Sequence, residues 1–370
     1  MGSRRAGRNL FCSAIAITDG VEVMTNPTAF GIETGYLKME DHPLLGRRNL
    51  MNLALLLWVP LPAVGCCLLL FGWFPDRQIP EDPGLIWPES FDQAAALLLH
   101  HPVLTVNLLF FLFVDIQFFL IALVQKSTWL IDPYWTLLPP LMALFFFTNP
   151  LSDPSEMRAL LCLLLLGVWS IRLTGNYFRR ERWQFGFRED WRYAKMRRER
   201  RFFMIEQVFV VYLAQHAMLV GLSLPFFAVA FFDVPVGVID GFLFAGACIG
   251  LIVAGLADSQ LDLFMRENAR RQESVEPRIQ LLDSGVWHYS RHPNYFGEQL
   301  FWWCIAGFGM VCGESWVVIG TAFNSCVLAG VTVMTERRML AIPDRRAAFQ
   351  AYQARTSVWV PWWPRSVPPS

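Results

Sequence analysis

Residues 284–303 read SGVWHYSRHPNYFGEQLFWW, and the interpretation of the whole chain starts from this stretch. Polar and ionisable side chains are concentrated here, immediately before an apolar run that continues through Val311. Pro293 has a fixed φ and no backbone N–H, so it suits the first turn of a helix and would disrupt a helix interior. We therefore predict a helix that begins near residues 292–294 and brings polar groups to the mouth of a membrane span.

The predicted helix places several polar or small residues on one face. Asn294, Gly297, Glu298 and Trp302 follow the i, i+3, i+4 and i+8 spacing of such a face. Gly297 would leave a gap in which a flat ligand could lie against the backbone. Glu298 lies one turn inside an apolar helix, and ionisable groups within a membrane are costly and usually functional.

Arg291 and His292 precede this helix, where the first-turn N–H groups and the helix dipole favour an anion. Two interpretations remain open for the pair. They could bind an anionic ligand, or they could be a pair that snorkels to the membrane interface.

The string RHPNYFGE followed by WW resembles the C-terminal domain of the steroid 5-alpha-reductase-like membrane proteins. A similar Arg-His-Pro followed by an aromatic residue and Gly occurs in isoprenylcysteine carboxyl methyltransferases. The motif therefore indicates the superfamily more strongly than the reaction. The resemblance covers roughly residues 125–365, a length that suits one compact domain.

Other segments add to the resemblance. Residues 125–135, 172–193 and 351–364 resemble successive blocks of the family, and residues 256–268 resemble a helix that lies beside the cofactor. The resemblance implies that Asp258 binds a ribose, that Arg266, Arg291, His292 and Arg355 hold phosphates, and that Asn294, Tyr295, Gly297 and Glu298 shape the pocket.

Simpler interpretations of these segments stay open. Asp258, Asp262 and Arg266 recur every fourth residue, a spacing that is also typical of surface helix support. The cations of the 172–201 segment could bind anionic lipid headgroups or the phosphates of a dinucleotide. Asp132 precedes Pro133, and this pair is typical of a helix start. Asp132 and Tyr295 are nevertheless the candidate proton donors.

Composition favours a membrane protein. Hydrophobic residues make up 54% of 370 residues, and the mean hydropathy is positive. The net charge is zero, so we expect no nucleic acid partner. All cysteines except Cys12 lie in or beside apolar runs, and no C-x-x-C spacing predicts a metal site.

We predict an all-α, polytopic transmembrane helical bundle of about eight spans. The spans are 50–74, 102–124, 134–149, 157–173, 203–232, 237–257, 296–313 and 316–334. Pro139 and Pro140 should kink or break the third, and Pro225 in the long fifth permits a kinked helix or a hairpin. The basic 172–201 segment should be cytosolic, and eight spans then put both termini in the cytosol.

The resulting organisation has three parts. Residues 1–49 would form a flexible cytosolic tail, residues 50–124 two N-terminal spans, and residues 125–365 the membrane domain. The first two spans are either an N-terminal addition to the membrane domain or an unrecognised part of the same helical bundle. Asp115 and Gln117 lie in the middle of the second span, where an unpaired polar group is expensive. His216 is a candidate partner for Asp115.

The expected function is reduction of a carbon–carbon double bond in a sterol or other lipid by NADPH, in the endoplasmic reticulum membrane. A methyltransferase that uses S-adenosylmethionine on a lipid or prenylcysteine is the second hypothesis. A non-enzymatic regulator of sterol or lipid homeostasis is the third. The N-terminal Glu and Tyr patterns of steroid 5-alpha-reductases are not found here, and no G-x-G-x-x-G indicates a Rossmann domain.

Overall fold

The computed structural model describes residues 44–74, 78–232 and 234–366, and these residues form helices and no strand. They lie within one compact unit, residues 40–370. The predicted tail falls largely outside the described residues, although its last three residues already belong to the first helix. The helices are α1 Arg47–Trp58, α2 Leu61–Phe71, α3 Phe91–His100, α4 Pro102–Phe110, η2 Phe111–Asp115, α5 Ile116–Gln125, α6 Ile131–Thr148, α7 Glu156–Arg180, α8 Trp191–Glu199, α9 Phe203–Gln207, η3 Val208–Leu213, α10 Ala214–Phe231, α11 Val238–Glu273, η4 Gly285–His288, α12 Pro293–Val311, η5 Ser315–Val317, α13 Val318–Ala341 and α14 Pro343–Arg355.

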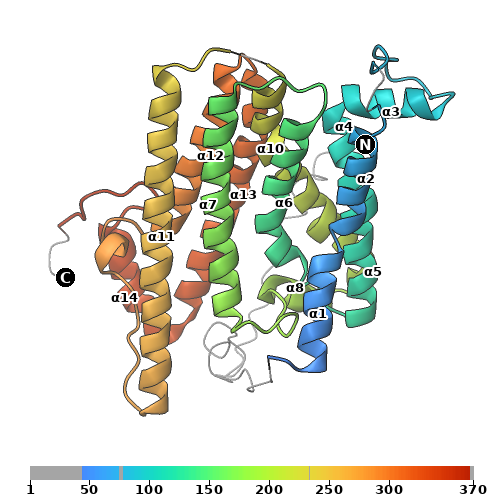
Figure 1. Cartoon of the computed structure of the whole chain (residues 1–370). Coiled ribbons are helices and arrows are strands. Elements are labelled where there is room, and N and C mark those ends of the chain that lie inside the picture. Colours follow the sequence, from blue (N-terminus) through green and yellow to red (C-terminus); the bar gives the residue numbers. More distant parts are fainter. Residues whose placement is uncertain (1–43, 75–77, 233, 367–370) are drawn as a thin grey trace, which may run out of the picture. The chain divides into compact units, whose positions relative to one another are not determined.

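Six helical segments of the described chain are long and apolar enough to cross a membrane. They are Arg47–Phe71, Pro102–Gln125, Glu156–Arg180, Phe203–Phe231, Val238–Glu273 and Ser315–Ala341. These segments confirm the prediction of an all-helical, multi-pass membrane protein, with six candidate spans in the described residues. The other two predicted spans correspond to α6 and α12, of 18 and 19 residues, which pack within the same bundle (Figure 1).

Of the two predicted outcomes at Pro139 and Pro140, a kink or a break, the break was wrong, because helix α6 continues through both prolines. Proline at position 140 cannot donate to the carbonyl of Thr136, which would be left without its helical partner. The Ser170 hydroxyl of α7 donates to this carbonyl at 2.8 Å. A neighbouring helix therefore satisfies the freed backbone group, as apolar surroundings require. Pro225 likewise lies inside α10 without forming a hairpin.

The first helix is joined to the region that resembles the known family. The Asn52 amide donates to the carbonyl of Phe185 at 2.7 Å, and the Asn49 side chain accepts from the Phe185 N–H at 2.6 Å. The Asn49 amide also donates to the Trp183 carbonyl at 3.0 Å. Both asparagines are buried. The N-terminal helix therefore contacts the 183–185 loop directly, as a part of the same bundle would.

The predicted partner of Asp115 is confirmed. His216 Nδ1 lies 2.7 Å from Asp115 Oδ2, and His216 Nε2 lies 3.0 Å from Asn107 Oδ1. Phe110 stacks on the imidazole with ring centroids 4.3 Å apart. Asp115 ends the π-helical segment η2, and η3 directly precedes the helix that carries His216. Asp115 is thus paired inside the bundle through Oδ2, while its Oδ1 has no hydrogen-bond partner.

Asp115→Leu should lower the free energy of unfolding by about 0.6–1.7 kcal/mol, the range measured for hydrogen bonds between membrane helices. The substitution leaves His216 with Asn107 as its remaining partner. Thermal unfolding in detergent measures the effect. Ser259→Ala is the control, because its hydroxyl bonds only within its own exposed helical turn. A variant as stable as the unaltered protein would contradict this prediction.

Candidate functional site

The predicted start of the motif helix is confirmed. Helix α12 begins at Pro293, with His292 as its N-cap. The face that contains Asn294, Gly297, Glu298 and Trp302 packs toward α7 and α11. Trp302 meets Trp169 of α7 edge to face, with ring centroids 4.9 Å apart. The motif therefore lies at the junction of three helices (Figure 1).

Glu298 is bound by two residues of α7. Its Oε2 accepts a hydrogen bond from Trp169 Nε1 at 2.8 Å, and its Oε1 pairs with the Arg172 guanidinium. Arg172 Nη1 also lies 3.6 Å from Asp258 Oδ2 on α11. One arginine therefore bridges a carboxylate of α11 and a carboxylate of α12.

Asp258 completes the arrangement. The Asn176 amide donates to Asp258 Oδ2 at 2.9 Å, and the Asn294 side chain also bonds to Asp258. We call Trp169, Arg172, Asn176, Asp258, Asn294 and Glu298 the inner cluster. Its Arg172, Asp258 and Glu298 side chains are 13%, 20% and 19% exposed, so they are enclosed but not sealed from a ligand.

Several polar atoms of this region have no hydrogen-bond partner. They are Arg172 Nε, Asn294 Oδ1 and Arg172 Nη1, although Nη1 makes the 3.6 Å ion-pair contact with Asp258, together with Trp302 Nε1 next to the cluster. Buried donors and acceptors are nearly always bonded, and leaving one unpaired costs about 1–3 kcal/mol. The cluster thus contains both donors and acceptors that no hydrogen bond of the described residues satisfies. Its two carboxylates and one guanidinium also give it an excess of negative charge.

The Gly297 prediction requires a correction. A Cβ on Gly297 would lie 2.5 Å from the Gly250 carbonyl oxygen and 2.7 Å from the Ala254 nitrogen. The gap in the helix face is therefore filled by the backbone of α11, and a flat ligand has no room there. Small residues that allow two membrane helices to approach closely are a common packing device. Gly297 shapes the site by allowing the backbones of α11 and α12 to pack closely.

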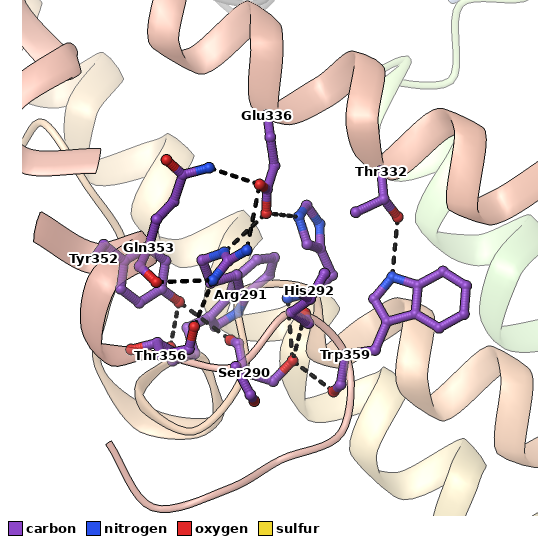
Figure 2. A network of polar contacts seen from close by, with 12 residues as sticks. Ser290, Arg291, His292, Thr332, Glu336, Tyr352, Gln353, Thr356 and Trp359 are labelled. Atoms are coloured by element: carbon purple, nitrogen blue, oxygen red, sulfur yellow. Dashed lines mark hydrogen bonds and ion pairs between the residues drawn. The ribbon is translucent and has the colours of Figure 1, made fainter. Parts of the chain in front are cut away.

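Arg291 and His292 converge on one carboxylate (Figure 2). Arg291 Nε lies 2.8 Å from Glu336 Oε1 of α13, and His292 Nε2 lies 3.1 Å from the same oxygen. The Gln353 amide donates to Glu336 Oε2 at 2.7 Å. Arg291 also donates to the Thr356 carbonyl at 2.5 Å. In this arrangement Arg291 and His292 connect the motif to α13, α14 and the segment that follows α14.

The same loop holds the C-terminal segment by backbone contacts. The N–H groups of Arg291 and His292 donate to the carbonyls of Ser357 and Val358 at 2.9 and 3.0 Å. Ser290 Oγ donates to the Trp359 carbonyl at 2.7 Å. The Tyr352 hydroxyl donates to the Ser290 carbonyl at 3.1 Å, and burial raises its pKa. The motif therefore has an evident structural role.

The remaining predicted phosphate ligands are more accessible. Arg266 Nε lies 2.9 Å from Asp262 Oδ2, and Arg355 pairs with Asp283. Their side chains are 56% and 37% exposed. The Arg355–Asp283 pair is exposed on both sides, and such pairs contribute only about 0–1 kcal/mol, so a phosphate can replace Asp283 at little cost.

The two candidate proton donors lie near a common arginine. Tyr295 stacks on His292 and bonds to the Thr335 side chain. Asp132 belongs to the first turn of α6 but does not cap it. Arg192, from the basic 172–201 segment, interacts electrostatically with both of these side chains.

Arg192 is itself held by the loop before α8. Its Nε and Nη2 lie 2.9 and 3.1 Å from the two oxygens of Asp190. Burial raises the pKa of Asp190, but the hydrogen bonds and charge of Arg192 outweigh it and lower this pKa below its ordinary value. Burial also raises the pKa of the neighbouring Tyr193 to about 12. Asp190 is therefore anionic, and its hydrogen bonds hold the Arg192 side chain in place.

Sequence reasoning missed the contributions of Trp169, Arg172, Asn176 and Glu336. A signal for the α7 residues was present, because Trp169, Arg172 and Asn176 share the i, i+3, i+7 face of an apolar helix. Arg172 was considered only as one of the cations of the 172–201 segment, for topology or for binding headgroups or phosphates, and not as a partner of Glu298. Glu336 had no comparable signal, since its partners come from two other segments.

Comparisons with known proteins identify one family and one relative. The family described as "Protein of unknown function (DUF1295)" matches residues 118–356. An uncharacterised protein of Schizosaccharomyces pombe is 26% identical over 255 residues, which cover 64% of this chain and 73% of that protein. No solved structure matches the chain.

Proposed function

The chain belongs to the DUF1295 family, and from this premise we propose that it is a membrane-embedded reductase related to the steroid 5-alpha-reductase-like proteins. Its reaction would be the NADPH-dependent reduction of a carbon–carbon double bond in a sterol or other lipid. The proposal places it in the endoplasmic reticulum membrane, where α6 and α12 complete eight spans and both termini are cytosolic. The motif RHPNYFGE supports the assignment.

One structural observation carries most of this proposal. The inner cluster gathers Arg172, Asp258, Asn294 and Glu298 among membrane helices and leaves polar atoms without partners. Polar groups in such a place are costly, so a structural role alone would favour complete pairing. Unpaired donors beside unpaired acceptors fit a ligand rich in hydroxyl and amide groups.

The residues fit the ribose end of NADPH better than its phosphates. Asp258 can accept hydrogen bonds from ribose hydroxyls, and Arg172 and Asn294 supply further polar atoms. Arg266 and Arg355 remain available for phosphates because their own side chains are partly exposed. Arg291 and His292 would act by positioning the loop, since Glu336 already compensates them.

The chemistry divides between cofactor and chain. NADPH supplies a hydride when it is bound. The chain has to exclude water, orient the lipid and deliver one proton, for which Tyr295 and Asp132 are the candidates. Arg192, held by Asp190, would favour the anionic form of the donor after the proton has left.

Glu298→Gln should weaken NADPH binding by roughly 10- to 100-fold, the equivalent of losing one hydrogen-bonded charge contact. The substitution removes the main counter-charge of Arg172 and so changes the orientation of its guanidinium. Isothermal titration of purified protein measures the affinity. Glu206→Gln is the matched control, because it removes an exposed ion pair with Arg200. Unaltered affinity in a folded Glu298→Gln protein would refute the cofactor site.

A methyltransferase is the second candidate, and the charge of the inner cluster favours it. Two carboxylates against one guanidinium suit a ligand with positive charge, such as S-adenosylmethionine. A ligand that binds the folded state raises the unfolding temperature with its concentration. Thermal shifts measured side by side with NADPH and S-adenosylmethionine will distinguish the two candidates.

A non-enzymatic regulator of sterol or lipid homeostasis is the third candidate. It is favoured by the ion pairing of Arg266, Arg291, His292 and Arg355 with the chain's own carboxylates. The lipid composition of cells with and without the protein tests all three functions. If the Asn294→Ala, Glu298→Ala double variant restored the lipid composition of deficient cells, the regulator would be supported over either enzyme.

A further inference from the structure

The C-terminal segment after α14 is fixed against a membrane helix. Trp359 Nε1 donates to Thr332 Oγ1 of α13 at 3.0 Å, and α13 belongs to a candidate span (Figure 2). The Trp362 N–H donates to the Tyr289 carbonyl at 2.9 Å. These contacts connect the segment to the motif loop and keep it beside the bundle. Tryptophan and tyrosine in such positions are typical of the membrane interface.

An aromatic hollow lies between this segment and the motif loop. It has a volume of about 450 Å³ and is lined by Tyr289, Pro361, Trp362 and Trp363. The rings of Tyr289 and Trp363 stand nearly perpendicular, with an interplanar angle of 82° and centroids 5.4 Å apart. Trp362 and Trp363 are 69% and 74% exposed. Two ring planes therefore form a corner, and the indole of Trp362 adds further aromatic surface.

The lining suits a particular kind of cation. The face of an aromatic ring is electron-rich and attracts a cation within about 6 Å of the ring centroid. A primary ammonium also needs hydrogen-bond acceptors, and none of the described residues that line the hollow is acidic. A quaternary ammonium has no N–H to satisfy, so an apolar aromatic lining accommodates it without that cost.

A nearby cation can complete a zwitterionic headgroup. Arg365 is exposed and follows Trp363 by two residues. Its N–H donates to the Arg355 carbonyl at 2.9 Å, which brings the segment back along the end of α14. Its guanidinium could bind the phosphate of a headgroup whose quaternary ammonium meets the aromatic rings.

We propose that Tyr289, Trp362 and Trp363 form an aromatic cage for the choline headgroup of a membrane phospholipid, with Arg365 toward its phosphate. The occupant is a lipid, because the segment is fixed to a membrane helix and exposes Val360 and both tryptophans. This site is separate from the inner cluster, and the proposal does not depend on the proposed function.

Native mass spectrometry of the full chain, released from nanodiscs of equal parts phosphatidylcholine and phosphatidylethanolamine, tests the cage. We expect phosphatidylcholine to be retained preferentially. Trp363→Leu should reduce that preference by about two- to fivefold, and Trp363→Phe should keep most of it, because an exposed cation–π contact contributes ~0.5–1 kcal/mol. Trp87→Leu, at a 90% exposed tryptophan on a distant loop, should change nothing.

Two outcomes would overturn the proposal. Equal retention of both lipids by the unaltered protein would show an interfacial aromatic belt without headgroup selectivity. Full retention of phosphatidylcholine by Trp363→Leu would show that apolar contact alone suffices. Should Trp363→Leu fail to fold, competition by soluble phosphocholine in the unaltered protein decides the question. Displacement of retained phosphatidylcholine supports the cage, and its absence refutes it.

Discussion

Glu336→Ala should lower the free energy of unfolding by about 3–5 kcal/mol, because removing one partner of a buried ion pair leaves the other charge uncompensated. Glu336 accepts hydrogen bonds from Arg291, His292 and Gln353, and the Arg291 side chain is only 9% exposed (Figure 2). Without the carboxylate, the guanidinium would retain two backbone carbonyls as partners.

The consequence should extend beyond stability. Because the motif loop holds the C-terminal segment, we expect Glu336→Ala to expose residues 356–366 to limited proteolysis. Thermal unfolding in detergent and the rate of C-terminal cleavage are the two measurements. Glu206→Ala is the control, since its ion pair with Arg200 is exposed and should contribute at most about 1 kcal/mol. If Glu336→Ala unfolded like this control, the carboxylate would not organise the loop.

Gly320→Ala should destabilise the bundle by about 3 kcal/mol or more, at the upper end of what overpacking costs. A Cβ on Gly320 would lie 2.0 Å from the carbonyl carbon and oxygen of Gly221 on α10. Both obstacles are backbone atoms, so no side-chain rotation can relieve the clash. The two helices would have to separate along their contact.

Gly330→Ala on the same helix provides a matched control. A Cβ there meets nothing within 4 Å, and alanine is favoured over glycine inside a helix by about 1 kcal/mol. This variant should therefore be neutral or slightly stabilised in the same thermal unfolding measurement. If the two substitutions had equal effects, the close approach of α10 and α13 would be wrong.

The helical periodicity and the long apolar runs were sufficient to predict the helices, because span length and hydropathy depend on local composition. The start of α12 at Pro293 followed from the chemistry of one residue. Pairing of Asp115 with His216 was predictable, since an isolated carboxylate in the bundle would be too costly. The continuity of α6 was not, because it depends on Ser170 of another helix.

The sequence by itself determined that this is a multi-pass helical membrane protein with polar groups concentrated at the start of α12. Tertiary structure decided which of those groups face each other. Arg291 and His292 bind Glu336, and Glu298 binds Arg172, because helix packing brings together residues that are 44 to 126 positions apart. Local spacing can place a residue on a helix face, but only the packing of whole helices selects its partner.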